Sequence, residues 1–97
     1  MYNNSIKITY DAAKRRKTLE ERGLDFEDAS EVFAGETMDG PDDRWDYGES
    51  RIKTVGFLRG RMVIIIWTPR WGKHHIISMR KANDREQKKY RQRFSQS

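Results

Sequence analysis

Apolar residues concentrate between positions 61 and 80, and this stretch predicts the centre of a β-sheet. Met62 to Trp67 form an unbroken run of apolar, mostly β-branched residues, which is typical of a strand covered on both faces. The run is too short to cross a membrane. Residues 68–72 include Pro69 and Gly72 and predict a turn that leads into a second strand over residues 73–80.

Side chains alternate between the two faces of a strand, so this second strand carries polar and apolar residues side by side. Strict alternation predicts one face with His75, Ile77 and Met79, and the other with His74, Ile76, Ser78 and Arg80. The adjacent histidines would then lie on opposite faces. We therefore do not expect a two-histidine metal site.

The N-terminal third predicts one short strand and two helices. Residues 6–10 alternate in the pattern of a strand, and Asp11 can cap a helix that ends before Gly23. Asp25 can cap a second helix, with Asp28 placed for a capping box, which ends near Gly35.

The rest of the chain predicts a meander and a final helix. Residues 36–48 indicate an acidic, turn-rich connection with a short strand at its start, and 49–58 a strand joined to the central strand by a hairpin at Arg59 and Gly60. Asn83 and Glu86 predict a capping box for a helix over 84–94, and we expect residues 95–97 to fray. The predicted fold class is α+β, with residues 1–97 as one domain: a small antiparallel sheet packed by two N-terminal helices and one C-terminal helix.

Composition limits the core and the kinds of site. The 97 residues are 35% hydrophobic and 36% charged, which leaves a modest core. The chain has no cysteine, which excludes disulfides and thiolate metal sites. Residues 1–10 lack the apolar run of a signal peptide and no stretch resembles a membrane span, so we expect no membrane association and a cytoplasmic location.

Charge is strongly segregated along the chain. Residues 20–50 hold 12 acidic and 2 basic side chains, whereas residues 51–79 hold 6 basic and no acidic ones. Residues 1–19 and 80–97 are also basic, and the whole chain carries a formal charge of +5. Such a chain offers an anionic ligand a basic sheet and a cationic partner an acidic flank, although any single Lys or Arg is more often plain solvated surface.

Four groups of residues, in this order, carry a resemblance to a known family. The first is Tyr10, Asp11, Ala12, Ala13 and Lys14; the second is Glu21, Arg22 and Gly23, followed by Phe26, Glu27, Asp28, Ala29, Val32 and Phe33. The third is Gly48, Glu49, Ser50 and Arg51 with Val55 and Gly56; the fourth runs from His75 to Asn83 and adds Glu86. In order and separation these groups resemble the motifs of the BrnT family of type II toxins. Tyr10, Arg22 and His75 stand where that family usually has Trp, His and Arg.

The resemblance implies a fold similar to RelE-like ribonucleases and cleavage of RNA that blocks translation and arrests growth. It also implies a cognate antitoxin, BrnA-like, with a ribbon-helix-helix part that binds promoter DNA, in a 2:2 complex. We expect no metal and no other cofactor.

RNA cleavage needs a base for the 2′-hydroxyl, cations for the phosphate and an acid for the leaving oxygen. Glu49 is a candidate base, and His75 can serve as acid or base. Candidate phosphate clamps are Arg51, Arg61, Arg70 and Arg80, because a guanidinium binds two phosphate oxygens. Further candidates for binding RNA are Tyr10, Trp67 and Trp71, which could stack on bases, and Lys14 from the first motif.

Each assignment has an alternative. The alternative for Glu49 is a simple ion pair with a surface arginine, which its position alone favours. Trp67 ends an apolar run and is better explained as core. For Lys14 to Lys17 and for the basic C-terminal helix the alternative is plain solvated surface. Two other functions stay open: an RNA-binding module without catalysis, and a subunit that assembles a complex through a sheet edge and the basic helix.

Overall fold

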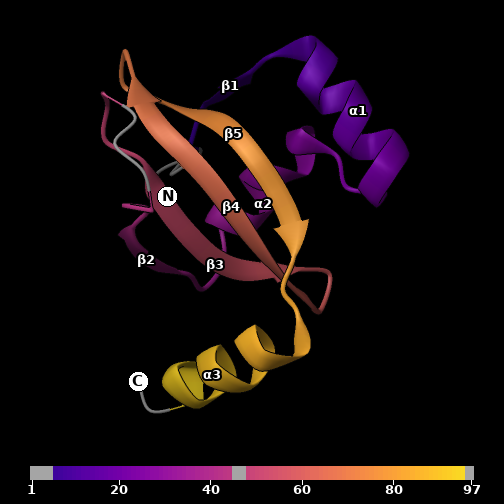
Figure 1. The fold of residues 1–97 in the computed structure, drawn as a ribbon, viewed down its shortest axis with the longest axis vertical. Coiled ribbons are helices and arrows are strands. Elements are labelled where there is room, and N and C mark those ends of the chain that lie inside the picture. Colours follow the sequence, from indigo (N-terminus) through magenta and orange to yellow (C-terminus); the bar gives the residue numbers. More distant parts are fainter. Residues whose placement is uncertain (1–5, 45–47, 96–97) are drawn as a thin grey trace, which may run out of the picture.

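The computed structural model describes residues 6–44 and 48–95 and shows a five-stranded mixed sheet with helices on both faces (Figure 1). The strands lie in the order β1-β5-β4-β3-β2. In chain order the elements are β1 (Ile8–Tyr10), α1 (Ala12–Arg22), the 3₁₀ helix η1 (Phe26–Asp28), α2 (Ala29–Phe33), β2 (Met38–Pro41), β3 (Ile52–Leu58), β4 (Arg61–Arg70), β5 (Lys73–Lys81) and α3 (Asp84–Ser95). The α+β class and the order of the predicted elements are confirmed.

The prediction of a purely antiparallel sheet was wrong, because β1 pairs with β5 in parallel. The other three strand pairs are antiparallel. Tight hairpins fix the relative direction of strands that follow one another, such as β3 and β4. The first strand and β5 lie more than 60 residues apart in the chain, so no turn signal in the sequence reports their direction.

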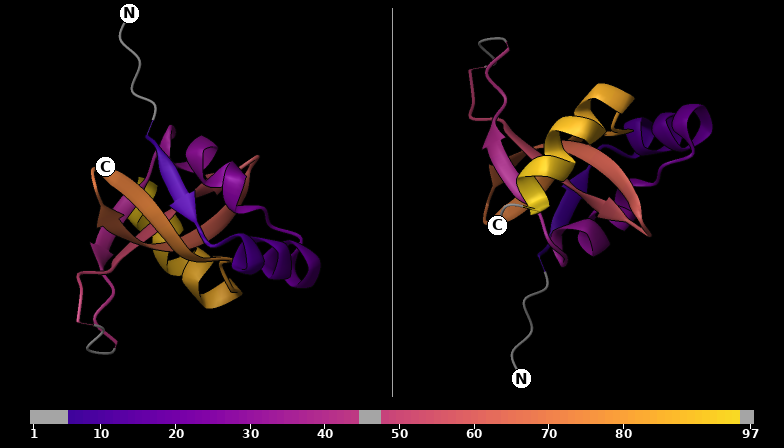
Figure 2. Two further views of the ribbon diagram at one scale, coloured as in Figure 1. Left: turned by 90° about the horizontal axis from the view of Figure 1, so that it is seen from above. Right: turned by 90° about the horizontal axis from the view of Figure 1, so that it is seen from below.

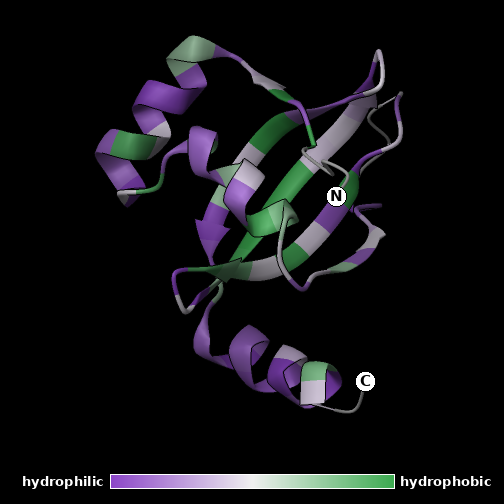
Figure 3. Ribbon diagram, turned by 180° about the vertical axis from the view of Figure 1, so that it is seen from behind, coloured by the Kyte–Doolittle hydropathy of each residue, from purple (hydrophilic) through white to green (hydrophobic). Residues whose placement is uncertain are grey.

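The sheet separates two apolar clusters. The first lies between the sheet and the η1–α2 segment, and its centre includes Phe26, Val32, Ile65 and Met79. The second lies between the opposite face and α3, where Tyr90 is buried. Figure 2 shows α2 and α3 on opposite sides of the sheet, and Figure 3 shows apolar strand positions behind α2. We call these sides the α2 face and the α3 face.

The central strand is β4, as predicted, and its residues from Met62 to Thr68 are buried. The strand continues into the predicted turn of residues 68–72 and ends only at Arg70. The turn itself therefore contains only Trp71 and Gly72. Both turn residues have positive φ, 50° and 73°, as in the tight turns that match the twist of paired strands. The proline is tolerated because it lies near the end of the ladder.

A β-bulge corrects the prediction of strict alternation along β5. Ile66 pairs with Ser78 and Trp67 pairs with Ile76, so Ile77 is the extra residue of β5. Ile76 and Met79, three residues apart, therefore both enter the cluster on the α2 face, while Ile77 packs on the α3 face. The bulge thereby reverses the side of every residue after it, relative to strict alternation.

The helix ends agree in part with the predicted caps. Asp11 accepts hydrogen bonds from the backbone N–H groups of Ala13 and Lys14, and Gly23 ends α1 in the left-handed conformation. The second predicted helix is split into η1 and α2, and the capping box predicted for Asp28 is wrong, because its carboxylate lies 3.4 Å from the guanidinium of Arg59 instead. In the described ranges no helix is long and apolar enough to cross a membrane.

The capping box predicted for the last helix is confirmed. Glu86 N–H donates to Asn83 Oδ1 at 2.8 Å, and Asn83 N–H donates back to Glu86 Oε1 at 3.0 Å. Both carboxylate oxygens of Glu86 also accept hydrogen bonds from Arg80, at 2.8 and 2.9 Å. The hydrogen bonds from Arg80 are the main cause that lowers the pKa of Glu86 to about 2. One ion pair thus fixes the start of α3 to β5. The structure includes Ser95 as the last residue of α3, in contrast to the expected fraying of residues 95–97. Residues 96–97 lie outside the described part.

A substitution at Gly56 tests how closely α2 packs against the sheet. A Cβ atom at this position would lie 2.6 Å from Val32 Cγ1 and 3.0 Å from Thr37 Cγ2. We expect Gly56→Ala to lower the free energy of unfolding by about 1–3 kcal/mol through overpacking. Urea unfolding measures the change, and Gly40→Ala, with no atom within 4 Å of the new Cβ, is the control. Equal losses in the two variants would contradict this packing.

The Arg80–Glu86 pair predicts an acid-sensitive contribution to stability. Because the carboxylate has a lowered pKa in the folded state, its contribution is present at neutral pH and is lost as the pH falls from about 5 to about 2. We expect Glu86→Gln to cost about 1–2 kcal/mol at pH 7, and less as the solution is acidified. Urea unfolding at several pH values checks this, and a loss independent of pH would contradict it.

Candidate functional site

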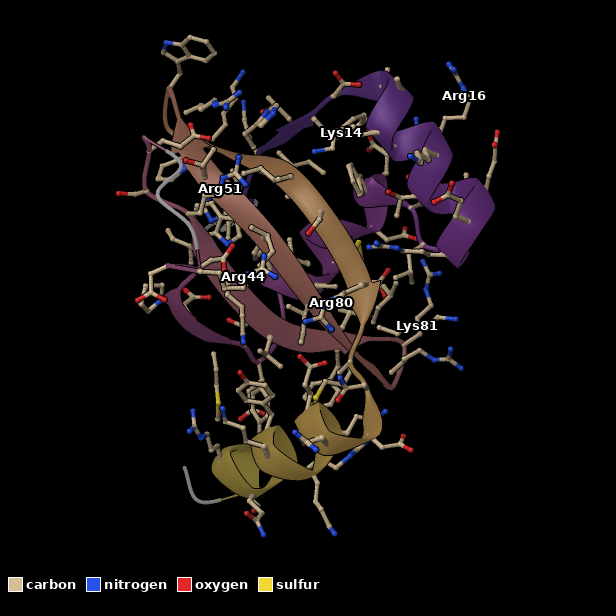
Figure 4. All side chains as sticks on the ribbon, viewed as in Figure 1. Lys14, Arg16, Arg44, Arg51, Arg80 and Lys81 are labelled. Carbon is tan, nitrogen blue, oxygen red and sulfur yellow. The ribbon has the colours of Figure 1, made fainter. Side chains whose placement is uncertain are left out.

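A groove lies between α1 and the open part of the α3 face, with a volume of about 380 Å³. Its helical wall is polar and mostly cationic, with side chains at helical spacing: Lys14, Lys17, Thr18, Glu21 and Arg22. Ile66, Ile77 and Ser78 form the floor, and Arg44 and Arg51 form the other wall. Figure 4 shows Lys14 on the α1 side and Arg51 across the sheet from it, whereas Arg16 points away from the molecule.

Polar contacts hold α1 in this position. None of its residues is buried, so it has no apolar stripe against the sheet. Arg15 instead donates two hydrogen bonds to Asp25, at 2.7 and 3.1 Å, and Arg22 donates one to the carbonyl of Met79 on β5, at 3.0 Å. This arrangement leaves the cationic side of the helix free to face the groove.

His75 lies on the same face as the groove, two positions before the groove residue Ile77, in a row of residues that crosses three strands. It pairs with Thr68 of β4, and Arg51, directly before β3, continues the row on the far side. The Nδ1 atom of His75 lies 2.8 Å from Thr9 Oγ1 of β1. His74 lies on the other face, stacked on Trp67 at 3.6 Å between ring centroids, so the predicted separation of the two histidines is confirmed.

The surroundings of His75 favour its neutral form. Burial is the main cause that lowers its pKa, and the positive charges of Arg70 and Lys14 lower it further, against the opposite effect of Glu49 and Asp11. The imidazole is therefore uncharged at neutral pH and has one nitrogen free to accept a proton. The charges of Lys14, Glu49 and Arg70 therefore all act on this ring.

Glu49 lies between two arginines. Its carboxylate accepts hydrogen bonds from Arg70 at 3.2 and 3.4 Å, and it lies 3.6 Å from Nε of Arg51. The surface ion pair expected from its position is therefore present. Its role as a base stays a prediction, while its visible effect is to hold both guanidinium groups near His75.

Arg44 is a groove residue that the sequence analysis missed. Its guanidinium donates two hydrogen bonds to Asp42, at 2.7 and 3.1 Å, and the side chain of Asp42 is only 2% exposed. A buried carboxylate thus fixes a cation at the wall of the groove. In the sequence both residues lie in an acidic, turn-rich connection, and only the Asp-x-Arg spacing hinted at this pair.

Arg80 shares the α3 face with His75, which strict alternation excluded. The two residues are nevertheless five positions apart, or about 16 Å along the strand. Both terminal nitrogens of Arg80 bind Glu86, so its visible role is to anchor α3. Whether it also contacts a ligand stays a prediction.

Other predicted site residues lie away from His75. Tyr10 is on the α2 face, where its hydroxyl donates to Glu27 and its ring packs against Phe26. Arg61 is at the opposite end of β4 from Arg70, and Trp71 projects from the hairpin with 92% of its surface exposed. Trp67 is core, as its position favoured, and its indole N–H donates to Thr54.

The donor set of the described residues includes no group of three or more His, Asp or Glu side chains that could hold a metal ion. What this face offers is arginines held by ion pairs and, on the same face, a neutral imidazole on which the charge of Arg70 acts. Such an arrangement suits a phosphodiester, because guanidinium and ammonium groups bind its oxygens and the imidazole can take a proton from a neighbouring hydroxyl.

Comparison with known proteins agrees with this chemistry. The model of a family described as "Ribonuclease toxin, BrnT, of type II toxin-antitoxin system" matches residues 10–86. The match begins at Tyr10 and ends at Glu86, the outermost residues of the four motifs, and includes the whole groove. The search of curated proteins gives no match. Because this match covers more than half of the chain, the chain belongs to the BrnT family of ribonuclease toxins of type II toxin–antitoxin systems.

Proposed function

We propose that this protein is a metal-independent endoribonuclease that cleaves RNA in the groove between α1 and the sheet. The observation that carries the proposal is the position of His75 on the open α3 face, hydrogen-bonded to Thr9 and paired with Thr68, where the charges of Arg70, Glu49 and Lys14 act on its ring. Family membership supports the reaction class, and the geometry supports the choice of these residues.

In the proposed reaction the base is His75. The reaction uses the tautomer in which Nδ1–H donates to Thr9 Oγ1, 2.8 Å away, so that Nε2 carries the free lone pair and takes the proton of the ribose 2′-hydroxyl. The 2′-oxygen attacks phosphorus, and the bond from phosphorus to the 5′-oxygen breaks. The products are a 2′,3′-cyclic phosphate and a 5′-hydroxyl, with no net use of water.

The cations stabilise the charge that develops on the phosphate oxygens. Arg51 and Arg70 bind these oxygens, and Lys14 donates a proton to the leaving 5′-oxygen. Glu49 holds the two guanidinium groups in place through the ion pairs at 3.2 and 3.6 Å. Trp71, exposed on the β4–β5 hairpin after Arg70, stacks on a base farther along the RNA.

In the cell we propose that this cleavage arrests translation and growth, and that both toxin and RNA are cytoplasmic. A cognate antitoxin, BrnA-like with a ribbon-helix-helix part, neutralises the toxin by covering the groove in a 2:2 complex. That complex binds promoter DNA through the antitoxin. The open α3 face, which α3 covers only at one end, offers the surface for this contact.

The proposed base predicts the pH dependence of cleavage. Since burial and neighbouring cations lower the pKa of His75, kcat/KM should rise through an acidic limb centred below the ordinary histidine value and stay constant at neutral pH. His75→Gln should lower kcat/KM by about 100-fold or more and remove this limb. Cleavage of a short RNA, with EDTA present throughout, measures both.

His74→Phe is the matched control, because it removes the neighbouring histidine while an aromatic ring still stacks on Trp67. It should keep both the rate and the limb. An acidic limb that persists in His75→Gln would exclude His75 as the base, and Glu49→Gln would then be the variant to test. Loss of activity in EDTA, restored by a divalent cation, would refute the metal-independent reaction.

Induced expression tests the proposed toxicity. The wild-type chain should arrest growth, and mapping of RNA ends should show cuts with a 5′-hydroxyl, whereas His75→Gln should do neither. Coexpression with the product of the neighbouring gene should restore growth and give a complex whose mass, by light scattering, fits two copies of each chain. A folded wild-type protein that binds RNA without cutting it would instead support a non-catalytic RNA-binding module.

A further inference from the structure

We infer that the β3–β4 hairpin end of the sheet is a second RNA-binding site, which holds the phosphates of a segment that flanks the cleaved bond. The inference rests on the proposed function, and it adds a site far from the catalytic groups. Its cations are Arg61, Lys81 and Arg91, gathered from β4, β5 and α3 around a hollow of about 400 Å³.

The backbone around this hollow is firmly held. The hairpin turns through Arg59 and Gly60, both with positive φ, and Ala82 N–H donates to the carbonyl of Met62 at 3.0 Å. Gln87 of α3 donates to the carbonyl of Ala82 at 3.1 Å. The three cations therefore project from fixed positions on three different elements.

These cations differ from their neighbours in having no acidic partner. Arg59, at the same hairpin, lies 3.4 Å from Asp28 and 3.2 Å from Glu31, which neutralise it. Within the described ranges, no ion pair includes Arg61, Lys81 or Arg91. Three unneutralised positive charges around one hollow favour an anion with several separate charges.

The lining favours nucleic acid over an acidic protein. The apolar residues of the hollow, Met62 and Ala82, are 1% and 6% exposed, so no apolar side chain is available to anchor a protein partner. Phosphate groups need only the cations. A phosphodiester chain therefore matches the surface better.

The position suits a continuation of the same RNA. Arg61 lies about 30 Å along β4 from Arg70, too far for both to bind one phosphate. Between the two ends, Figure 4 shows Arg51, Arg44, Arg80 and Lys81 one after another down the molecule. Lys81 pairs with Val63 of the α2-face cluster, so it points to the other side of β5 from Arg80. An RNA cleaved beside His75 would follow this line to Arg80 and pass round the edge of β5 to reach Lys81.

The test uses fluorescent single-stranded RNAs of about 6 and 20 nucleotides with 2′-O-methyl riboses, which cannot be cleaved. Binding to the full chain is measured by anisotropy over a series of KCl concentrations. The triple variant Arg61→Ala, Lys81→Ala, Arg91→Ala should bind the long RNA at least about tenfold more weakly, with a slope of log Kd against log[KCl] smaller by about 2. Its affinity for the short RNA should be unchanged.

The control variant Lys7→Ala, Arg16→Ala, Arg85→Ala removes the same charge from exposed positions elsewhere. If both triple variants weaken binding of the long RNA equally, the effect is one of net charge and the second site is refuted. If the first triple variant binds RNA normally but loses affinity for the antitoxin, the surface is a protein interface and the inference is also refuted.

Two further measurements keep the outcomes separate. Thermal unfolding followed by circular dichroism confirms that each variant is folded, and Arg61→Gln with Lys81→Gln replaces the triple variant if that one is not. Cleavage of a short RNA should be equal in wild type and triple variant. If the wild type neither binds nor cleaves RNA, the proposed function fails; if it does both and the triple variant matches it on long RNA, only the second site fails.

Discussion

The single extra residue at Ile77 of β5 is the constraint on which the rest of the site depends. Strand β5 must supply apolar side chains to the core on the α2 face, and Ile76 and Met79 do so three residues apart. A regular strand cannot place both residues on one face. The bulge solves this conflict, and it leaves His75, Ser78 and Arg80 together on the open face. Core packing and the arrangement of polar groups thus have one origin.

The local parts of the fold could be predicted because their causes are local. The caps at Asp11, Gly23 and Asn83, the hairpin at Arg59 and Gly60 and the buried run of β4 follow from residues within a few positions of each other. The parallel pairing of β1 and the bulge depend on contacts between distant segments. No periodicity in either segment reports them.

The candidate site, like the fold, was predicted only in part from the sequence. Motifs pointed to Lys14 and Arg51, which line the groove, and to Glu49 and His75, which are linked to them by an ion pair and by charge, but also to Tyr10, which lies on the other face. Arg44 was not predicted as a site residue, because its position depends on the buried carboxylate of Asp42. The burial of one acidic loop residue cannot be recognised within a hydrophilic stretch of sequence. Sequence identified the kinds of chemical group, and tertiary structure decided which of them meet.

Helix α1 is bound by charge and hydrogen bonds, and it contributes no buried side chain. The free energy that keeps it docked is therefore small compared with that of the sheet, whose core is apolar. High salt should loosen the helix while the strands stay folded, because exposed ion pairs are screened. This wall of the groove is thus easily displaced, and the width of the groove can adapt to what enters it at little energetic cost.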